Sequence, residues 1–274
     1  MSLFITSLNS GSNGNCYYVG NDNEAVLIDA GISCKETEIR MKRLGLSLRK
    51  VKAIFVSHEH SDHINGVSVL SKKYQIPVYV TPNTRREGRL NLKEGLAFSF
   101  RAYEVIRLGS LTVTAFPKLH DASDPHSFVV ASDSVKVGVF TDIGFACEHV
   151  IQNFKQCHAV FLESNYDEDM LEFGRYPIQL KNRIRDGKGH LSNKQALELF
   201  VQHRPAFMSH LLLSHLSAEN NSHKIVSQLF KEKSGNTKII IATRTKETPV
   251  YHIRHSTRAV SAVTPVSYSQ LSLF

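Results

Sequence analysis

Ser57-His58-Glu59-His60-Ser61-Asp62-His63 directly follows the apolar run Ala53-Ile54-Phe55-Val56. The segment has the pattern H-x-H-x-D-H, so four potential metal ligands lie within six residues. Imidazole suits zinc, iron and manganese, and a carboxylate widens the choice toward harder ions. A loop that leaves a strand end with this spacing can direct His58 and His60 at one metal ion. Asp62 and His63 can then face a second metal ion.

Three further candidate ligands occur downstream, namely His120, Asp142 and His215, and each follows a short apolar run. Active sites of layered α/β folds collect at such strand ends. A single histidine after a strand is more often structural, whereas the ordered set H-x-H-x-D-H, H, D, H is far more specific. Asp29 closes another apolar run and is better placed to orient a ligand histidine than to bind metal.

This ligand order resembles that of the metallo-β-lactamase superfamily, and several other segments are similar to its YycJ/WalJ subfamily. The resemblance implies an α/β (α+β) fold, a four-layer αββα sandwich, with a two-metal site and metal-dependent 5′→3′ DNA exonuclease activity. Members of the subfamily carry a histidine after the Glu-Ser-Asn triplet, whereas this chain has Tyr166, so no acid/base or metal role is transferred to position 166. The similar segments are 10–15, 29–31, 57–63, 140–144, 163–165, 174–177, 189–190, 213–217 and 220–221.

We assign the seven candidate ligands to two metal ions. His58, His60 and His120 are expected to bind the first ion. Asp62, His63 and His215 are expected to bind the second, with Asp142 bridging the two. Two ions ~3.5–4 Å apart can hold a bridging hydroxide, because metal binding lowers the pKa of water from about 15.7 toward ~7. Zinc is the first choice for this imidazole-rich site, and the two carboxylates leave manganese as an alternative.

The hydroxide would attack phosphorus in line with the leaving oxygen, and Asp62 would orient the hydroxide or accept its proton. His190 is the candidate for protonating the leaving group or contacting a phosphate. A local hydrogen bond at a helix start is an equally weighted alternative for His190. Glu163 and Asn165 follow a strand and are candidates for orienting His215 or contacting substrate, with a purely structural network as the alternative.

Ser12 and Asn13 lie in a short Ser/Gly-rich loop whose backbone N–H groups could bind an anion near the site. Such loops are more often simple turns.

Short apolar runs alternate with turn residues along the chain, which predicts a β-rich fold. Helical spacing of apolar residues predicts helices over 34–44, 64–73 and 193–202, the last capped by Ser192 or Asn193. Two β-rich halves with helices outside suit two sheets covered on both faces. The other strands expected are 3–8, 16–19, 25–29, 78–80, 100–106, 111–116, 127–131, 135–140, 159–162, 208–213 and 238–241.

The composition suits a soluble protein with a sizeable core, since the 274 residues are 42% hydrophobic and 21% charged. Motifs extend from residue 10 to residue 221, so we predict one catalytic domain over 1–255 and a flexible tail over 256–274. No apolar run approaches the ~20 residues that a membrane span needs, and no secretory signal is evident. Four cysteines without a C-x-x-C pair suggest reduced thiols in the cytoplasm.

The net charge is +8, from 33 basic and 25 acidic residues. Basic residues gather in two places beside the motifs, which favours a polyanionic substrate such as DNA. A phosphate backbone would be attracted by this charge without any reading of base sequence. One group comprises Arg175, Lys181, Arg183, Arg185 and Lys188, and the other comprises Arg85, Arg86, Arg89 and Lys93.

The final residues Gln270-Leu271-Ser272-Leu273-Phe274 resemble the Q-L-x-L-F peptide with which bacterial DNA polymerases and repair proteins dock on the sliding clamp. Leu271, Leu273 and Phe274 would be apolar anchors, and Gln270 would set the register by hydrogen bonds. The alternative is that this segment folds back onto its own domain.

The function expected is a two-metal DNA exonuclease of repair or replication. The same ligands also occur in phosphodiesterases that act on small cyclic or nucleotide phosphodiesters and in thioester hydrolases of the glyoxalase II type. A non-enzymatic adaptor with a vestigial site is a further alternative. The intact ligand set argues against the adaptor, and the basic clusters and tail argue against the other two.

Overall fold

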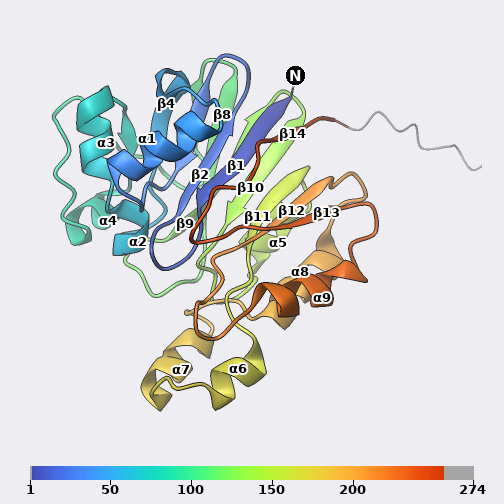
Figure 1. Ribbon diagram of the computed structural model, residues 1–274. Coiled ribbons are helices and arrows are strands. Elements are labelled where there is room, and N and C mark those ends of the chain that lie inside the picture. The colour runs from blue at the N-terminus through green and yellow to red at the C-terminus, as the bar shows by residue number, and fades with distance from the viewer. Residues whose placement is uncertain (1, 256–274) are drawn as a thin grey trace, which may run out of the picture.

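Two seven-stranded mixed sheets pack face to face in the computed structural model, which describes residues 2–255 (Figure 1). Helices cover the outer face of each sheet, so the expected four-layer αββα sandwich is confirmed. The predicted tail over 256–274, with its clamp-like peptide, lies outside the described residues.

The first sheet has the order β14-β1-β2-β3-β4-β5-β6. The pairs from β14 to β3 are antiparallel and those from β3 to β6 are parallel. The carboxyl ends of β3, β4, β5 and β6 therefore meet at one edge. The strands are β1 Leu3–Asn9, β2 Cys16–Gly20, β3 Ala25–Ile28, β4 Val51–Phe55, β5 Val78–Tyr79, β6 Ala97–Phe98 and β14 Tyr251–Ile253.

The second sheet has the order β13-β12-β11-β10-β9-β8-β7. Its strands from β13 to β10 are parallel, and those from β10 to β7 form an antiparallel meander. The strands are β7 Val105–Leu108, β8 Leu111–Pro117, β9 His126–Ser132, β10 Val135–Phe140, β11 Ala159–Glu163, β12 His210–Ser214 and β13 Lys238–Ile241.

Burial of both sheet faces explains why the central strands are continuously apolar. In β3, Val26 and Ile28 face the core between the sheets, whereas Ala25 and Leu27 face the core beneath the helices. All four residues are fully buried. The period of two along a strand thus fills two cores from one short run.

Four helices, α1 to α4, flank the first sheet, and α5, α8 and α9 cover the second (Figure 1). A capping box between Ser192 and Gln195 starts α8, which selects Ser192 over Asn193 as the N-cap. The helices are α1 Cys34–Arg43, α2 Ser61–Ile64, α3 Val67–Tyr74, α4 Pro82–Glu87, α5 Glu148–Phe154, α6 Glu168–Phe173, α7 Ile178–Arg185, α8 Asn193–His203 and α9 His223–Lys231, with a 3-10 turn at Leu48–Lys50.

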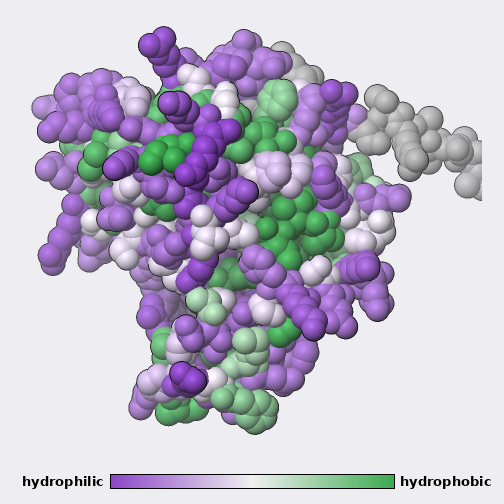
Figure 2. All heavy atoms as spheres, in the orientation of Figure 1, coloured by the Kyte–Doolittle hydropathy of each residue, from purple (hydrophilic) through white to green (hydrophobic). Residues whose placement is uncertain are grey.

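The α6–α7 segment projects from the sandwich (Figure 1). Figure 2 shows hydrophobic residues beside hydrophilic ones on this projection. Phe173, at the end of α6, is 86% exposed. This segment contains four of the five residues of the 175–188 basic group. It therefore places their positive charge outside the layers of the sandwich.

Two predicted elements were wrong in extent. The helix expected over 64–73 is divided into α2 and α3, because the Gly66 N–H donates to Ala30 O at 2.8 Å and the chain turns there to pack on the loop after β3. The strand expected over 100–106 begins only at Val105, because a turn with Tyr103 at φ 64 interrupts it. The short strands β6 and β14 were not expected.

Within residues 2–255, no helix combines the length and the apolar character that crossing a bilayer would require.

Candidate metal centre

The site lies where strand ends of both sheets meet. Asp29 follows β3, His58 follows β4, and Asp142 and His215 follow β10 and β12. Parallel strands in a sheet point the same way, so residues that follow them gather at one edge. Asp29, Asp142 and His215 have positive φ values of 59, 55 and 55°. Such values are uncommon for residues other than glycine and cluster at functional sites, where the surrounding structure holds them.

Three ring nitrogens form a first cluster. His58 Nε2 lies 3.1 Å from His60 Nδ1, and His120 Nε2 lies 3.3 Å from the same atom. His58 is fully buried, His120 is 6% exposed, and His60 is half-buried. These are the three residues that the sequence assigned to the first metal ion, and the ligand atoms lie within 4.8 Å of one another.

A second cluster contains the residues assigned to the second ion. Asp62 Oδ2 lies 3.5 Å from His63 Nε2 and 3.4 Å from His215 Nε2. Asp142 lies between the clusters, because its Oδ2 is 3.1 Å from His63 Nε2 and its Oδ1 is 3.9 Å from His120 Nε2. Asp142 also belongs to a ligand group with His58 and His63, which joins the two clusters.

The second ring nitrogen of most of these histidines has its own partner. His63 Nδ1 lies 2.7 Å from Asp29 Oδ2, and His120 Nδ1 lies 2.9 Å from Gly189 O. His58 Nδ1 lies 2.9 Å from Ser57 Oγ, which itself donates to Asp29 Oδ2 at 2.8 Å. Partners of this kind fix the ring orientation and leave the opposite nitrogen to bind metal.

Glu163 orients two histidines at once. Its Oε1 lies 3.0 Å from His215 Nδ1 and 2.8 Å from His190 Nδ1. Its Oε2 accepts from the Ile143 N–H at 2.7 Å and the Leu191 N–H at 3.2 Å. Asn165 holds the backbone nearby, since its Nδ2 donates to His215 O at 2.7 Å.

The spacing of the ligand atoms fits metal binding. Zinc–nitrogen bonds of about 2.0–2.1 Å in a tetrahedral arrangement put ligand atoms roughly 3.3–3.4 Å apart. The separations within both clusters, 3.1 to 3.5 Å, match this value. Asp142 Oδ2 and His215 Nε2 are also buried without a hydrogen-bond partner among the described residues. Buried polar atoms normally have partners, so the two clusters are consistent with a binuclear metal site.

The histidine pKa values are lowered in the first cluster, where burial dominates, and the pKa of His63 is raised in the second, where carboxylates dominate. Burial lowers the pKa of His58 well below its usual value, and it lowers the pKa of His120 to about 4. These imidazoles are therefore neutral and ready to act as ligands. Burial would also lower the pKa of His63, but the carboxylates of Asp142, Asp62 and Asp29 outweigh it and raise that pKa. The second cluster thus favours positive charge.

A pocket of about 290 Å³ opens onto the clusters, and helix α7 forms one of its walls. His60, Asp62, Asp142, His190 and His215 all line it. Sequence reasoning missed three of its other residues, Asp121, Leu180 and Ile184, whereas it had placed Arg183 in a basic group and Tyr176 and Ser217 in family-like segments. Leu180 and Ile184 gave no signal in the sequence because they lie on α7, far along the chain from the metal motif, and Asp121 gave none because it lies outside the ligand pattern.

The Ser12-Asn13 loop agrees with its expected role only in part. Ser12 and Asn165 line the pocket. The Asn13 side chain instead donates to Arg244 O at 2.8 Å, and the Gly14 N–H is used in a turn to Gly11 O. The Gly14 N–H is therefore not available to an anion.

Two polar residues near the clusters, Asn15 and Lys118, were not singled out. Asn15 Nδ2 lies 3.0 Å from Asp62 Oδ2 and 3.1 Å from His63 Nε2. Lys118 is 4% exposed and donates to Thr141 O at 2.8 Å, beside Asp142. Tyr166, to which no role was transferred from the sequence, is 5% exposed, and burial raises its pKa to about 12.

Comparison with known proteins agrees with this geometry. Residues 10–177 match the family model described as the metallo-beta-lactamase superfamily. Exodeoxyribonuclease YycJ of Bacillus anthracis is 37% identical over 240 residues, which are 85% of this chain and 91% of that protein. Exodeoxyribonuclease WalJ of Streptococcus pneumoniae serotype 2 is 29% identical over 221 residues, covering 78% of this chain and 81% of that protein.

Solved structures show the same fold at lower identity. The metallo-beta-lactamase fold protein YhfI from Bacillus subtilis has a TM-score of 0.72 at 16% identity, covering 92% of this chain and all of that one. At this identity the likeness concerns the fold alone. Together with the family match and the YycJ and WalJ similarity, these comparisons show that the chain belongs to the metallo-β-lactamase superfamily and is a metal-dependent hydrolase of that fold.

Proposed function

We propose that this chain is a two-metal DNA exonuclease of repair or replication. The observation that carries the proposal is the pair of ligand clusters at a pocket beside a basic helical projection. Relatives named exodeoxyribonucleases that align over most of the chain support it. The 5′→3′ polarity rests on the resemblance to the YycJ/WalJ subfamily.

The residues that would hold the metals are the two clusters described above, with Asp142 between them. When bound, two divalent ions supply an acidified water and neutralise negative charge on a phosphodiester. Zinc suits the imidazole-rich set, and manganese suits the added carboxylates. The partners of the ring nitrogens hold the ligands in place before substrate arrives, which reduces the reorganisation that the reaction needs.

Asp62 and His190 are the two side chains that would transfer protons in this reaction. Asp62 faces the pocket with an 18% exposed side chain and can accept a hydrogen bond from an attacking water. His190 also faces the pocket, with a 22% exposed side chain, and Glu163 fixes its Nδ1. The other nitrogen, Nε2, is the atom that would donate a proton to the leaving oxygen or contact a phosphate.

Positive charge around the pocket favours a polyanion. Arg183 of α7 lines the pocket and pairs with Asp121. Lys181 and Arg185 lie on the same helix, and Arg185 pairs with Glu172. Such a surface attracts a phosphate backbone in a salt-dependent way and raises the rate of encounter.

We further propose a cytoplasmic location and docking on a sliding clamp. The location is supported by the four free thiols of Cys16, Cys34, Cys147 and Cys157, which suit a reducing compartment. Clamp docking through Gln270, Leu271, Leu273 and Phe274 rests on the sequence, and these residues lie outside the described part of the chain.

Digestion of end-labelled DNA tests the proposed function. The zinc- or manganese-loaded chain should degrade linear duplex from the 5′ end and leave closed circles intact. Asp62→Ala should abolish this activity, and Asp22→Ala, an exposed carboxylate elsewhere, should retain it. Cleavage of bis(p-nitrophenyl) phosphate without any cleavage of DNA would replace this proposal with a small-phosphodiester hydrolase.

A further inference from the structure

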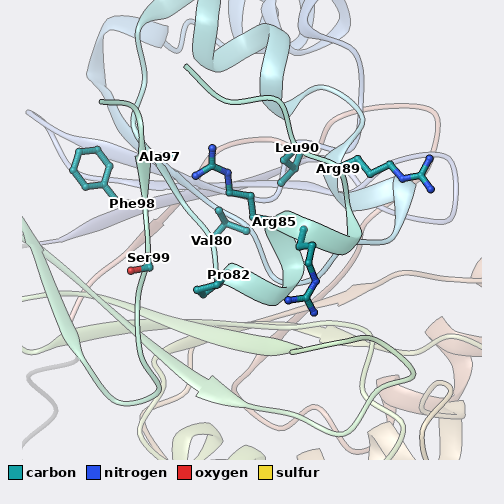
Figure 3. A pocket seen from close by; sticks show the side chains of 9 residues that line it. Val80, Pro82, Arg85, Arg89, Leu90, Ala97, Phe98 and Ser99 are labelled. Carbon is teal, nitrogen blue, oxygen red and sulfur yellow. The ribbon is translucent and has the colours of Figure 1, made fainter. Parts of the chain in front are cut away.

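A second pocket, of about 520 Å³, lies between α4 and β6 and is separate from the metal centre. Its walls combine arginine side chains with an apolar floor (Figure 3). In Figure 3, Arg85, Val80 and Leu90 lie between Phe98 on one side and Arg89 on the other. Arg86 also lines this pocket. The combination of cations with apolar surface in a concavity points to a ligand with both negative charge and flat apolar groups.

The positive charge of this pocket is largely uncompensated. Arg85, Arg86 and Arg89 are all exposed. Arg86 pairs with Glu87 at 2.9 Å. Across the described residues, neither Arg85 nor Arg89 forms an ion pair with a carboxylate. Two free guanidinium groups on one short helix suit an anion such as phosphate.

An aromatic ring is exposed beside the pocket, on the face of the edge strand β6 that is opposite to α4. Phe98 is 43% exposed although it lies on a strand of the sheet. It stacks on Tyr79 with ring centroids 5.4 Å apart, and Tyr79 stacks on Phe55 at 4.8 Å. The ring is thus anchored to the core through a stack and still has exposed surface. Such an anchored aromatic is suited to stacking on an unpaired base.

The pocket lies on the same edge of the sheet as the metal motif. Strands β4, β5 and β6 run parallel, so Ser99 follows β6 as His58 follows β4. Neighbouring strands are about 4.8 Å apart, which puts β6 roughly 10 Å from β4. The end of α4 also packs closely against the metal motif. A Cβ atom added at Gly88 would lie 2.9 Å from Ile64 Cδ1 and 3.3 Å from Glu59 Cβ.

We propose that the α4–β6 pocket binds a single-stranded segment of the DNA substrate, a few nucleotides from the bond that is cleaved. Arg85 and Arg89 contact phosphates in the pocket, and Phe98, on the other face of the edge strand β6, stacks on a base of the same DNA segment. The inference rests on the proposed nuclease function and adds a strand-binding site to it. A dinucleotide has a single phosphodiester, which the metal centre would hold, so it offers no second phosphate to Arg85 and Arg89.

The test compares Arg85→Ala/Arg89→Ala with the matched variant Lys231→Ala/Lys233→Ala. The control removes two exposed charges at the end of α9, which precedes the amino end of β13 and so lies away from the metal edge. Binding of a fluorescent oligothymidylate of about 12 nucleotides is measured by anisotropy in chelator, so that the strand stays intact. Turnover of the same strand and of a dinucleotide is measured with the metal-loaded chain.

The arginine variant should bind the long strand about tenfold more weakly. The slope of log K against log salt should fall by about 0.7 for each arginine lost. Its kcat/KM should fall for the long strand and stay unchanged for the dinucleotide. Phe98→Leu, which keeps an apolar side chain but removes the ring, should weaken binding without changing the salt slope. The lysine control should behave as wild type.

Wild-type affinity in the arginine variant would overturn the inference, as would an equal loss in the lysine control. If the arginine variant also turns over both DNA substrates at the wild-type rate, the proposed nuclease function is not contradicted. Conversely, a wild-type chain that cleaves no DNA but binds the strand through these arginines would contradict the nuclease function alone.

Discussion

At the scale of single residues, Glu163 shows how a buried carboxylate organises the site. It accepts from two backbone N–H groups and from His190 and His215. Burial alone would raise the pKa of Glu163, but His190 and His215 outweigh it and lower that pKa to about 2. The stabilisation that this carboxylate provides is therefore present above its unfolded pKa near 4.5 and is lost as the pH falls toward about 2.

Glu163→Gln should weaken metal binding. An amide keeps the shape but has one acceptor oxygen in place of two, so it cannot serve both histidines and both backbone N–H groups. We expect a loss of about 10–100-fold in metal affinity and a parallel loss of turnover. Calorimetric titration with metal measures the affinity. Glu172→Gln, on the exposed face of α6, is the control. Undiminished affinity in Glu163→Gln would mean that the residue is purely structural.

His190→Ala separates leaving-group protonation from phosphate binding. A nucleotide alkoxide needs a proton as it leaves, whereas p-nitrophenolate does not. If His190 is the general acid, DNA turnover should fall by about 10²–10⁴-fold while bis(p-nitrophenyl) phosphate turnover changes little. Equal losses on both substrates would assign His190 to phosphate contact instead. His149→Ala, an exposed histidine outside the pocket, should leave both rates unchanged.

At the scale of elements, the loop after β3 and the metal-motif loop pack by their backbones. Gly31 donates to Asn15 O at 2.8 Å, and Asn15 N donates to Asp62 O at 2.7 Å. A Cβ on Gly31 would lie 1.6 Å from Asp62 O. The Asp29-Ala30-Gly31 sequence therefore needs glycine at its end because the motif backbone passes directly over it.

Gly31→Ala should both destabilise the fold and disturb the metal site. The added methyl group must displace the backbone of Asp62, and overpacking of this kind costs about 1–3 kcal/mol. Urea unfolding measures the stability, and metal titration measures the expected drop in affinity. Gly45→Ala is the control, since nothing lies within 4 Å of its Cβ, although its φ of +69° costs some strain. Gly31→Ala with unchanged metal affinity would contradict the predicted shift of Asp62.

At the scale of the whole molecule, the metal centre joins the two sheets. His58 follows a strand of the first sheet, whereas His120, Asp142 and His215 follow strands of the second. Metal ions bound by both sets would link the sheets at their shared edge, in addition to the apolar core between them. Metal binding should therefore couple to the stability of the entire sandwich.

Removal of metal should lower the Tm. At a free metal concentration 1,000 times Kd, binding adds about 4 kcal/mol to the free energy of unfolding. For a chain of this size that corresponds to a drop in Tm of about 8–16 °C on chelation. Thermal unfolding with and without chelator measures the drop, and added zinc should reverse it. A His58→Ala/His215→Ala variant should show no response to chelator. An identical Tm for the loaded and chelated wild-type chain would contradict the linkage.

Deletion of residues 270–274 should abolish clamp binding, because Leu271, Leu273 and Phe274 are the expected anchors. Turnover of short DNA should not change, since the metal ligands all lie within residues 58–215. Binding to purified sliding clamp by calorimetry measures the first effect. Clamp affinity that survives the deletion would exclude this segment as the docking peptide.

The sequence alone predicted the candidate metal ligands, the layered fold and most strands. Ligand type and spacing are local properties, and apolar runs that end in a polar side chain report strand ends directly. Only the tertiary structure decided which polar side chains share a partner, as Glu163 does with His190 and His215, and which loops come together, as those of Gly31 and Asp62 do. It also placed α7 over the pocket and the arginines of α4 at the outer edge of the first sheet. These contacts join residues far apart in the chain, and the packing of the two sheets, rather than any local pattern, brings them together.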